Sequence, residues 1–402
     1  MSYTFSRLES AGLVNQRVFL RVDYNVPYNK ETKEISDFTR IKATIPTINE
    51  LIKQGASVVL CSHLGRPSGP GDKQYSTEFL SSVISGMLGK PVEFIPGAIE
   101  AEAQDKVKAL NPGQVALLEN IRFYEEETSK DASVRDSFAK LLMENCDVYV
   151  NDAFGACHRA HASTDNCAKL KKSYPGLLVQ REVDILSKIL VNPPKPFVAI
   201  IGGAKVSTKL EVLEFLVKKV NHLLLGGAMT YTLMKSRLMD VGNSLVENEF
   251  LSRAFQVVDK ADFHQCDLQL PDDHVIVQRL EEGAKKKVSS KQIPVGWMGV
   301  DIGPKTINKY TKILKQAKTI LWNGPMGVFE QPPFDTGTNA LANALKSSDS
   351  FSVVGGGDSI AAIEACNAAE NITHISTGGG ATLEFLSGKK LPGLEALNQG
   401  NK

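Results

Sequence analysis

Short apolar runs alternate along this chain with longer segments in which apolar residues recur at helical spacing. Runs of this length that are nearly continuous are typical of strands buried on both faces, and therefore of parallel sheets covered by helices. We predict ten such strands, at Val18–Val22, Ser57–Cys61, Val92–Ile95, Val115–Leu118, Asp147–Val150, Phe197–Ile201, His222–Leu225, Thr319–Trp322, Phe351–Val354 and Thr373–Ser376.

The segment Asp37–Gln54 shows the helical pattern most clearly, because four isoleucines share one stripe and Gly55 follows as a stop. Pro46 interrupts this pattern, so we expect it to kink the helix or limit its length. The same spacing predicts helices over Val206–Lys219, Glu247–Lys260 and Thr336–Lys346.

The middle of the chain contains a break between two halves. A predicted helix at Arg181–Leu190 ends in a proline-rich segment, 191–196, and a strand follows at once. With 402 residues and about five strands on either side, the chain exceeds the usual size of a single core. We predict the α/β class with two doubly wound parallel-sheet (Rossmann-like) domains joined by a hinge helix, the first over residues 1–180 and the second, which begins with that helix, over 181–390.

Composition limits the classes of partner and the cellular compartment that we expect for this protein. Lys and Arg number 46 against 45 Asp and Glu, so a global basic field for nucleic acid is absent. The six cysteines form no C-x-x-C pair, which favours free thiols in a reducing compartment. The start lacks the apolar run of a secretory signal and no stretch reaches membrane-span length, so we expect a cytoplasmic protein with no membrane partner.

Glycines follow five predicted strands of the second half. Open parallel sheets bind ligands at the carboxyl ends of their strands, where these glycines lie. Glycine there lets the backbone approach a ligand, and a following helix offers free N–H groups to phosphate. Neither G-x-x-x-x-G-K-[ST] nor G-x-G-x-x-G is present, which argues against a Walker loop and a classical dinucleotide fold. The pattern predicts a phosphate or nucleotide site at Gly202-Gly203, Gly226-Gly227, Asn323-Gly324, Gly355–Gly357 and Gly378–Gly380.

Three kinds of side chain accompany these glycines. Lys205 and Lys209 are spaced i, i+4, so on a helix both ammonium groups would face one phosphate chain. Asp358 follows three glycines and fits either a helix N-cap or a carboxylate for nucleotide-bound Mg²⁺. Glu330 ends a glycine-containing stretch and could accept hydrogen bonds from ribose hydroxyls.

The first half contains arginines at strand ends and helix starts instead. A cluster of guanidinium groups recognises a small, multiply charged anion such as a phosphorylated carboxylic acid. The arginines are Arg21, Arg40, Arg66, Arg122 and Arg159, and Asp23, Asn25 and His63 lie beside them in the sequence.

Three other chemistries fit poorly. Cys157, His158, His161 and Cys167 match no common zinc spacing. Nucleophilic Ser or Cys catalysis would need an elbow such as G-x-S-x-G, which is missing. A nucleic-acid module is disfavoured by the near-zero net charge, although local arginines leave it open.

Eight sequence blocks together resemble the phosphoglycerate kinase family. They occur in family order from about residue 18 to residue 393, so the resemblance covers almost the whole chain. The blocks are RVDYNVP (21–27), SHLGRP (62–67), ENIRF (119–123), VNDAFGA with HRAHAST (150–164), GGAKVS (202–207), WNGPMGVFE (322–330), GGGDS (355–359) and STGGGA (376–381).

The resemblance implies a two-lobed kinase that transfers a phosphoryl group between Mg-ATP and 3-phosphoglycerate. It places the acid on Asp23, Asn25, Arg40, His63, Arg66, Arg122 and Arg159. It places the nucleotide on Gly203, Lys205, Lys209, Gly299, Asn323, Glu330, Gly357, Asp358 and Ser359, with Asp358 reaching the Mg²⁺. Residues 391–402 would pack back on the first domain.

The implied mechanism needs no general base, because a carboxylate acceptor is already ionised at neutral pH. Catalysis would then be positioning and electrostatics, with Arg40 and Lys205 as flanking cations and N–H donors at Gly357 and Gly380. We expect the lobes of a monomer to close for transfer and expect no nucleic-acid partner. Two alternatives remain: a phosphotransferase of the same fold for another small acid, and a non-catalytic anion- or nucleotide-binding protein.

Overall fold

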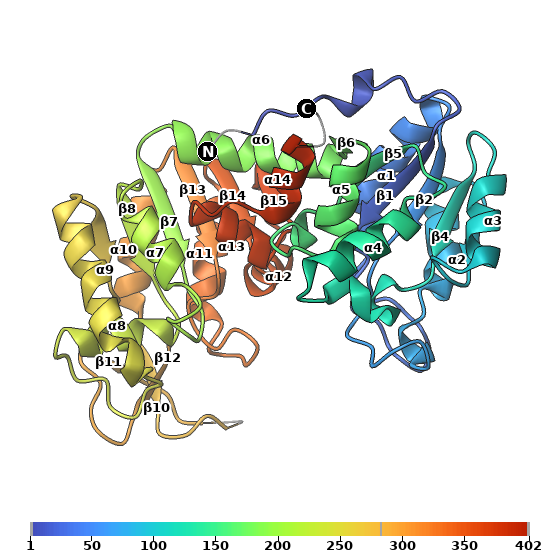
Figure 1. Ribbon diagram of the computed structural model, residues 1–402. Helices are drawn as coiled ribbons and strands as arrows, with labels where there is room; N and C mark the ends of the chain where they lie inside the picture. The colour runs from blue at the N-terminus through green and yellow to red at the C-terminus, as the bar shows by residue number, and fades with distance from the viewer. Residues whose placement is uncertain (1–2, 282–283, 400–402) are drawn as a thin grey trace. The chain divides into compact units, whose positions relative to one another are not determined.

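The computed structural model describes residues 3–281 and 284–399, and its chain divides into two compact units (Figure 1). The first unit runs to Ile185 and takes in the chain again from Lys390, and the second is Leu186–Lys389. Each unit contains a six-stranded parallel sheet with helices interleaved along the chain. The predicted class, two α/β parallel-sheet domains, is confirmed.

The first sheet has the strand order β3-β4-β2-β1-β5-β6, with every neighbouring pair parallel. Five strands lie within one or two residues of the predicted runs. The sixth was missed because its sequence, KSYP, contains no apolar run even though three of its residues are buried. The strands are β1 (Arg17–Val22), β2 (Ser57–Cys61), β3 (Val92–Ile95), β4 (Val115–Leu118), β5 (Val148–Asp152) and β6 (Lys172–Pro175).

The helix α1 (Thr39–Lys53) buries the isoleucine stripe against this sheet, with Ile41, Ile48 and Leu51 in the core. Pro46 lies inside α1 and the helix continues to Lys53, so the proline does not limit the helix. The other helices of the unit are α2 (Glu78–Leu88), α3 (Ala101–Ala109), α4 (Ala132–Leu142), α5 (Cys167–Leu170) and α14 (Pro392–Gln399), with 3-10 turns at Leu8–Ser10, Lys73–Tyr75, Ile121–Phe123, Glu125–Thr128 and Phe154–Ala156 and a π-helical turn at Ala162–Asn166.

The second sheet has the order β15-β14-β13-β7-β8-β9. Counted within the unit, this is the order 6-5-4-1-2-3 of the doubly wound dinucleotide folds, which bind ligands where the order reverses. The reversal lies between the central strands β7 and β13, so their carboxyl ends frame the expected crevice. The strands are β7 (Phe197–Ile201), β8 (His222–Leu225), β9 (Asp267–Gln269), β13 (Thr319–Asn323), β14 (Phe351–Gly355) and β15 (His374–Ser376).

This unit also contains a small antiparallel sheet, which the sequence prediction lacked. Its strands are β11 (Lys287–Ser289), β10 (His274–Val277) and β12 (Met298–Ile302), in that order. A small cluster of Val277, Val300 and Phe334 forms its core. The strands are short, and β11 and β12 contain polar residues, so no long continuous apolar run marks this sheet in the sequence.

The helices of the second unit match the predictions unevenly. The helix α11 (Thr336–Lys346) agrees fully, whereas α7 (Leu210–Leu216) is shorter than predicted. The predicted helix Glu247–Lys260 is a 3-10 turn, Asn248–Phe250, followed by α9 (Leu251–Phe263). The remaining elements are α8 (Met229–Ser236), α10 (Pro304–Leu314), α12 (Gly357–Ala365), α13 (Gly380–Leu386) and a 3-10 turn at Ala369–Asn371.

The helix predicted at Arg181–Leu190 is longer in the structure, α6 (Leu177–Val191), and the division between the units falls within it. Its first N–H groups are held by the first unit. The backbone N–H of Leu177 donates to Thr47 Oγ1 at 3.0 Å, and that of Leu178 donates to Asp152 Oδ1 at 2.9 Å.

The end of the described chain lies on the first unit, where the Gly393 N–H donates to the Cys157 carbonyl at 2.9 Å. Residues 400–402 of the predicted 391–402 segment lie outside the described residues. Over residues 3–281 and 284–399, the structure contains no helix with the length and apolarity to cross a bilayer.

Candidate active site

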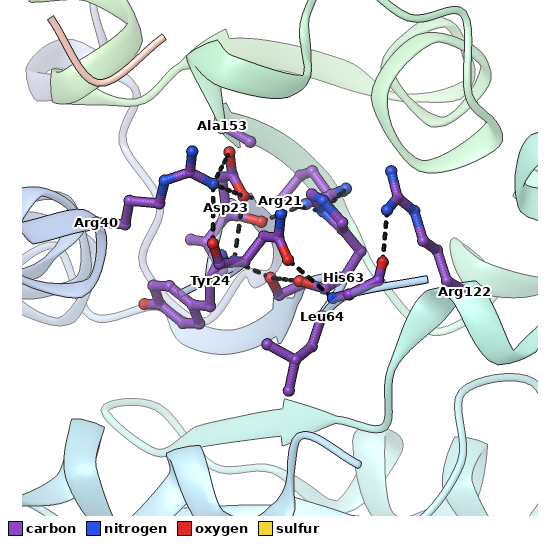
Figure 2. A network of polar contacts seen from close by, with 12 residues as sticks. Arg21, Asp23, Tyr24, Arg40, His63, Leu64, Arg122 and Ala153 are labelled. Carbon is purple, nitrogen blue, oxygen red and sulfur yellow. Dashed lines mark hydrogen bonds and ion pairs between the residues drawn. The ribbon is translucent and has the colours of Figure 1, made fainter. Parts of the chain in front are cut away.

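A cluster of charged side chains gathers at the carboxyl ends of β1 and β2 and at the start of α1 (Figure 2). Asp23 lies at its centre. Arg40 Nη1 donates to both carboxylate oxygens of Asp23 at 3.1 Å and to the Asn25 carbonyl at 3.1 Å. Among the described residues, the other guanidinium nitrogens of Arg40 have no partner, and its side chain keeps 33% of its exposure. Arg40 is therefore anchored through one nitrogen and free to bind through the others.

His63 follows β2 and faces Arg21, a residue the sequence placed in the cluster without giving it a role. Arg21 Nη2 lies 3.2 Å from His63 Nδ1, and both side chains are buried, with 1% and 7% of the residues exposed. His63 Nδ1 lies 3.9 Å from Asp23 Oδ1, beyond hydrogen-bond distance.

The loop after β2 brings in Arg122. Asn25 Oδ1 accepts the Gly65 N–H at 2.8 Å, and Arg122 Nη1 donates to the Gly65 carbonyl at 2.7 Å. Asn120 is fully buried and braces the loop by donating to the Leu64 carbonyl at 2.8 Å. Single-sequence reasoning missed Asn120, because nothing in its local pattern separates a structural amide from an ordinary loop residue.

Arg66 and Arg159 lie exposed at the edge of this network. Within the described part of the chain neither side chain has a hydrogen bond or ion pair. Both still act electrostatically. Arg66 adds to the effect of burial in lowering the pKa of Arg122, and Arg159 adds to it in lowering the pKa of His161. We call Asp23, Asn25, Arg40, His63, Arg66, Arg122 and Arg159 with Arg21 the arginine cluster.

The electrostatics of the arginine cluster are strongly positive. Burial alone would raise the pKa of Asp23, but the charges of Arg40 and Arg21 and the hydrogen bond from the Asn25 N–H hold that pKa below its usual value. Burial lowers the pKa of His63 well below its ordinary range. For His161, burial followed by Arg21, Arg122 and Arg159 lowers the pKa to about 3. At neutral pH the histidines are uncharged, and the arginines outnumber the carboxylates around them.

In the second unit the glycine-rich strand ends pack backbone against backbone. A Cβ on Gly202 would lie 2.0 Å from the Pro325 carbonyl oxygen, and one on Gly324 would lie 2.2 Å from the Gly202 oxygen. A Cβ on Gly227, at φ +70°, would lie 2.5 Å from the Gly203 carbonyl oxygen. Only glycine fits at these crossings, where the ends of β7, β8 and β13 converge.

A methyl group at this crossing has a measurable consequence. Gly202→Ala should destabilise the protein by about 1–3 kcal/mol or more, because the neighbouring atom is backbone and cannot turn away. Calorimetric unfolding measures the change. Gly357→Ala is the matched control, since a Cβ there meets nothing within 4 Å. Equal unfolding temperatures for the two variants would contradict the packing argument.

The side chains of Lys209 and Asn323 meet at this edge of the sheet, and Asp358 interacts electrostatically with Lys209. Lys209 Nζ donates to Asn323 Oδ1, and the buried Asn323 amide nitrogen has no hydrogen-bond partner among the residues that the structure describes. Burial lowers the pKa of Lys209 to about 8, with Asp358 opposing the shift. Burial and then Glu330 raise the pKa of Asp358, with Lys209 opposing. The structure therefore brings Lys209, Asn323, Glu330 and Asp358 together.

The helical argument for Lys205 and Lys209 is wrong. The helix α7 begins only at Leu210, and residues 206–209 form a turn in which the Lys209 N–H donates to the Val206 carbonyl at 2.8 Å. Glu247 holds this turn by accepting the Ser207 hydroxyl at 2.6 Å and the Ser207 N–H at 3.0 Å. Lys205 is exposed, whereas Lys209 is half-buried and reaches Asn323.

Asp358 is not the N-cap of α12. Gly356, at φ +91°, holds that position and Asp358 lies in the first turn. Ser359 is buried and accepts the Gly324 N–H at 2.7 Å, so it fixes the loop after β13. Gly299 lies on β12, where a Cβ would come within 2.0 Å of the Tyr231 hydroxyl, and Gly380 opens α13.

No group of three or more His, Cys, Asp or Glu side chains suited to a metal occurs in the described parts of the chain, residues 3–281 and 284–399. All six cysteines are free. A zinc site at Cys157, His158, His161 and Cys167 is thus unsupported. Asp358 alone suits a metal that takes most of its ligands from phosphate oxygens and water, as Mg²⁺ does. No hydrogen bond occupies the Asp358 carboxylate among the described residues.

Comparisons with known proteins agree with this arrangement. The sequence model of the family described as phosphoglycerate kinase matches residues 8–389. A phosphoglycerate kinase of Leptospira biflexa is 50% identical over 97% of both chains, and a chloroplastic one of Volvox carteri is 46% identical over 98% of this chain and 85% of its own.

Solved structures of phosphoglycerate kinases also resemble this chain over nearly its whole length. Phosphoglycerate kinase from Coxiella burnetii has a TM-score of 0.88 and 40% identity, covering 99% of this chain and 100% of that one. The enzyme from Pyrococcus horikoshii OT3 has a TM-score of 0.85 and 34% identity, covering 99% of each chain. The chain therefore belongs to the phosphoglycerate kinase family, whose members are phosphotransferases with a carboxyl group as acceptor.

Proposed function

We propose that the arginine cluster binds 3-phosphoglycerate and that the glycine-rich strand ends bind the ATP or ADP with which this kinase exchanges a phosphoryl group in glycolysis. The observation that carries the first half is the excess of guanidinium groups over carboxylates around Asp23. A phosphorylated acid offers a phosphate and a carboxylate, and guanidinium groups bind both in a fork geometry.

The second half of the proposal is supported by the topology of the second sheet. Its order reverses at β7 and β13, whose carboxyl ends hold Gly202, Asn323 and the buried Lys209. Glycine at strand ends lets the backbone approach a ligand closely, and the N-terminus of α12 offers N–H groups that suit phosphate. We assign Gly203, Lys205, Lys209, Gly299, Asn323, Glu330, Gly357, Asp358 and Ser359 to this nucleotide site.

Mg²⁺ fits the residues present. Asp358 is exposed, and its pKa is raised by partial burial of the carboxylate and then by repulsion from Glu330. A divalent cation on nucleotide phosphates would relieve that repulsion. When bound, Mg²⁺ supplies charge neutralisation for the phosphates, and Asp358 is the residue that would hold it.

The chain's own residues do the rest by orientation and charge. The acceptor carboxylate is ionised at neutral pH, so no base is required, and the neutral His63 and His161 are not needed as one. We propose that the free guanidinium nitrogens of Arg40 and the ammonium of Lys205 stabilise the phosphoryl group in flight, with backbone N–H groups at Gly357 and Gly380. Transfer requires the two bound ligands to meet during the cycle.

A coupled assay tests this assignment directly. The protein with Mg-ATP and 3-phosphoglycerate should produce ADP, and other small phosphorylated acids should give little turnover. Turnover with a different acid would favour the same-fold phosphotransferase alternative. Nucleotide binding without any turnover would favour the non-catalytic alternative.

The buried Lys209 predicts a pH dependence of nucleotide binding. Its pKa of about 8 in the free protein means that it loses its proton as pH rises through 8, well below the ordinary 10.5. Bound phosphates favour the charged form, so binding above pH 8 should take up a proton. Calorimetric titration of ADP in buffers of different ionisation enthalpy measures this uptake.

Two outcomes bear on that prediction. Affinity for ADP should fall as pH rises above 8, and Lys209→Met should remove both the pH dependence and the proton uptake. Lys218→Met, at an exposed position after α7, is the control and should leave both unchanged. Equal proton uptake in the Lys209 variant would reject the role.

We also propose that the protein acts as a cytoplasmic monomer without nucleic-acid or membrane partners. The near-zero net charge supports the absence of a polyanion partner. Light scattering of the purified protein, with and without substrates, would measure its mass, and a mass of two chains would refute the monomer.

A further inference from the structure

Behind the arginine cluster lies a buried polar chain that the proposed chemistry does not use. Glu127, in the turn Glu125–Thr128, is 1% exposed, and Ser163, in the π-helical turn Ala162–Asn166, is fully buried. Glu127 Oε1 accepts the Ser163 hydroxyl at 2.6 Å, and Oε2 accepts the Ser163 N–H at 2.8 Å. Both oxygens of a buried acid are thus committed to one serine.

The chain continues from Ser163 to Arg21. Arg21 Nε donates to Ser163 Oγ at 2.7 Å, Nη1 donates to the Val22 carbonyl, and Nη2 points to His63 Nδ1 at 3.2 Å. Each side of the guanidinium group is therefore used (Figure 2). A fully buried cation needs a counter-charge, and Glu127 is the carboxylate that reaches it, through the serine.

The contact between Arg21 and His63 determines which ring nitrogen carries the proton. A guanidinium group has donors only and remains protonated in proteins. His63 Nδ1 must therefore present its lone pair to Arg21, and a neutral imidazole then carries its single proton on Nε2. Over the described residues Nε2 has no hydrogen-bond partner, so its N–H is left for a ligand.

We infer that Glu127, through Ser163 and Arg21, is a positioning residue that holds His63 as a permanent Nε2–H donor to an anionic oxygen of the bound acid. This inference rests on the proposed function for the identity of the acid. It assigns roles to Glu127, Ser163 and Arg21, which the motif analysis left without one.

The charged groups facing His63 agree with this arrangement. Burial disfavours the imidazolium, Asp23 favours it, and Arg21, Arg122 and Arg40 oppose a further positive charge. His63 thus stays neutral over the physiological range and cannot supply an ionic contact, so its contribution must come through a hydrogen bond of fixed direction.

Nitrogen-15 NMR of the ligand-free protein tests the inference without any activity. The His63 signals are assigned among the seven histidines by comparison with His63→Gln. They should show an unprotonated Nδ1 and a protonated Nε2, and they should not titrate between pH 5 and 8. An Nδ1–H tautomer, or titration near pH 6.5, would overturn the inference, whatever the protein binds.

Variants test the two residues behind Arg21. In Glu127→Gln the side-chain amide nitrogen must face one of the two Ser163 donors, so one hydrogen bond is lost. In Ser163→Ala the hydroxyl that connects Glu127 to Arg21 is absent. Both should move the His63 signals toward a mixture of tautomers and raise KM for 3-phosphoglycerate roughly tenfold, with kcat and KM for ATP changed far less. The exposed neighbour Glu126→Gln is the matched control and should change none of these.

The outcomes separate the two proposals. Unchanged tautomer and KM in both folded variants would reject the role of Glu127 and Ser163. If either variant fails to fold, the other variant and the tautomer of His63 in the wild-type protein still test the inference. A wild-type Nε2–H tautomer in a protein that does not bind 3-phosphoglycerate would count against the proposed function alone.

Discussion

Replacing Arg40 with alanine should lower kcat by about 10³-fold while raising KM for 3-phosphoglycerate much less. Arg40 is held by Asp23 and the Asn25 carbonyl through Nη1 alone, so its remaining nitrogens can follow charge that develops during transfer. A cation that acts on the phosphoryl group in flight contributes to kcat more than to binding. Steady-state kinetics in the direction of 3-phosphoglycerate phosphorylation measure both constants.

Two further variants sharpen this test. Arg40→Lys keeps the charge but loses the planar fork, so it should recover only part of the rate. Lys42→Ala removes an exposed cation from the same helix α1 and should leave kcat unchanged. An Arg40→Ala enzyme with near-normal kcat would remove Arg40 from the mechanism, and an equal loss in Lys42→Ala would point to a general field effect.

Replacing Asp358 with asparagine should weaken the binding of Mg-ADP by roughly 10- to 100-fold, the value of about 1.5–3 kcal/mol for a lost charged contact. Metal-free ADP should bind equally well or more tightly, because a carboxylate that repels phosphate is gone. Burial and then Glu330 raise the pKa of Asp358, and a cation bound there would favour its charged form. Calorimetry with and without Mg²⁺ measures both affinities.

The control for Asp358 is Glu364→Gln, an exposed acid on the same helix α12. It removes the same charge from the unit without touching the strand ends, so Mg-ADP affinity should not change. If Asp358→Asn binds Mg-ADP normally, the metal role is rejected. If it loses metal-free ADP as well, Asp358 acts on the fold of the loop and not on the cation.

The positions of most strands in the two parallel sheets could be predicted from the sequence because both faces of each sheet are buried. Continuous apolar runs then mark the strands, and ten of the predicted runs coincide with strands of the two parallel sheets. The strands that were missed, such as β6 and β11, are short and carry polar residues. Their place is fixed by neighbouring strands and not by their own pattern.

The candidate site likewise contains residues that the sequence could select and an arrangement that it could not predict. Residue types at strand ends were enough to select Asp23, Arg40 and His63, because parallel strands bring their carboxyl ends together. The i, i+4 argument for Lys205 and Lys209 failed because Glu247, distant in sequence, holds the preceding residues in a turn. Local spacing could not show a contact made by another segment.

The sequence by itself determined the class and the two parallel sheets, since these depend on the periodicity of apolar residues. Residue charge predicted the kind of ligand that each half would attract. Only the tertiary structure decided which groups are buried. Burial makes His63 neutral and lowers the pKa of Lys209 to about 8. It also links Glu127 to Arg21 through Ser163. These effects arise from desolvation and from contacts between residues far apart along the chain, and neither quantity is present in a linear pattern.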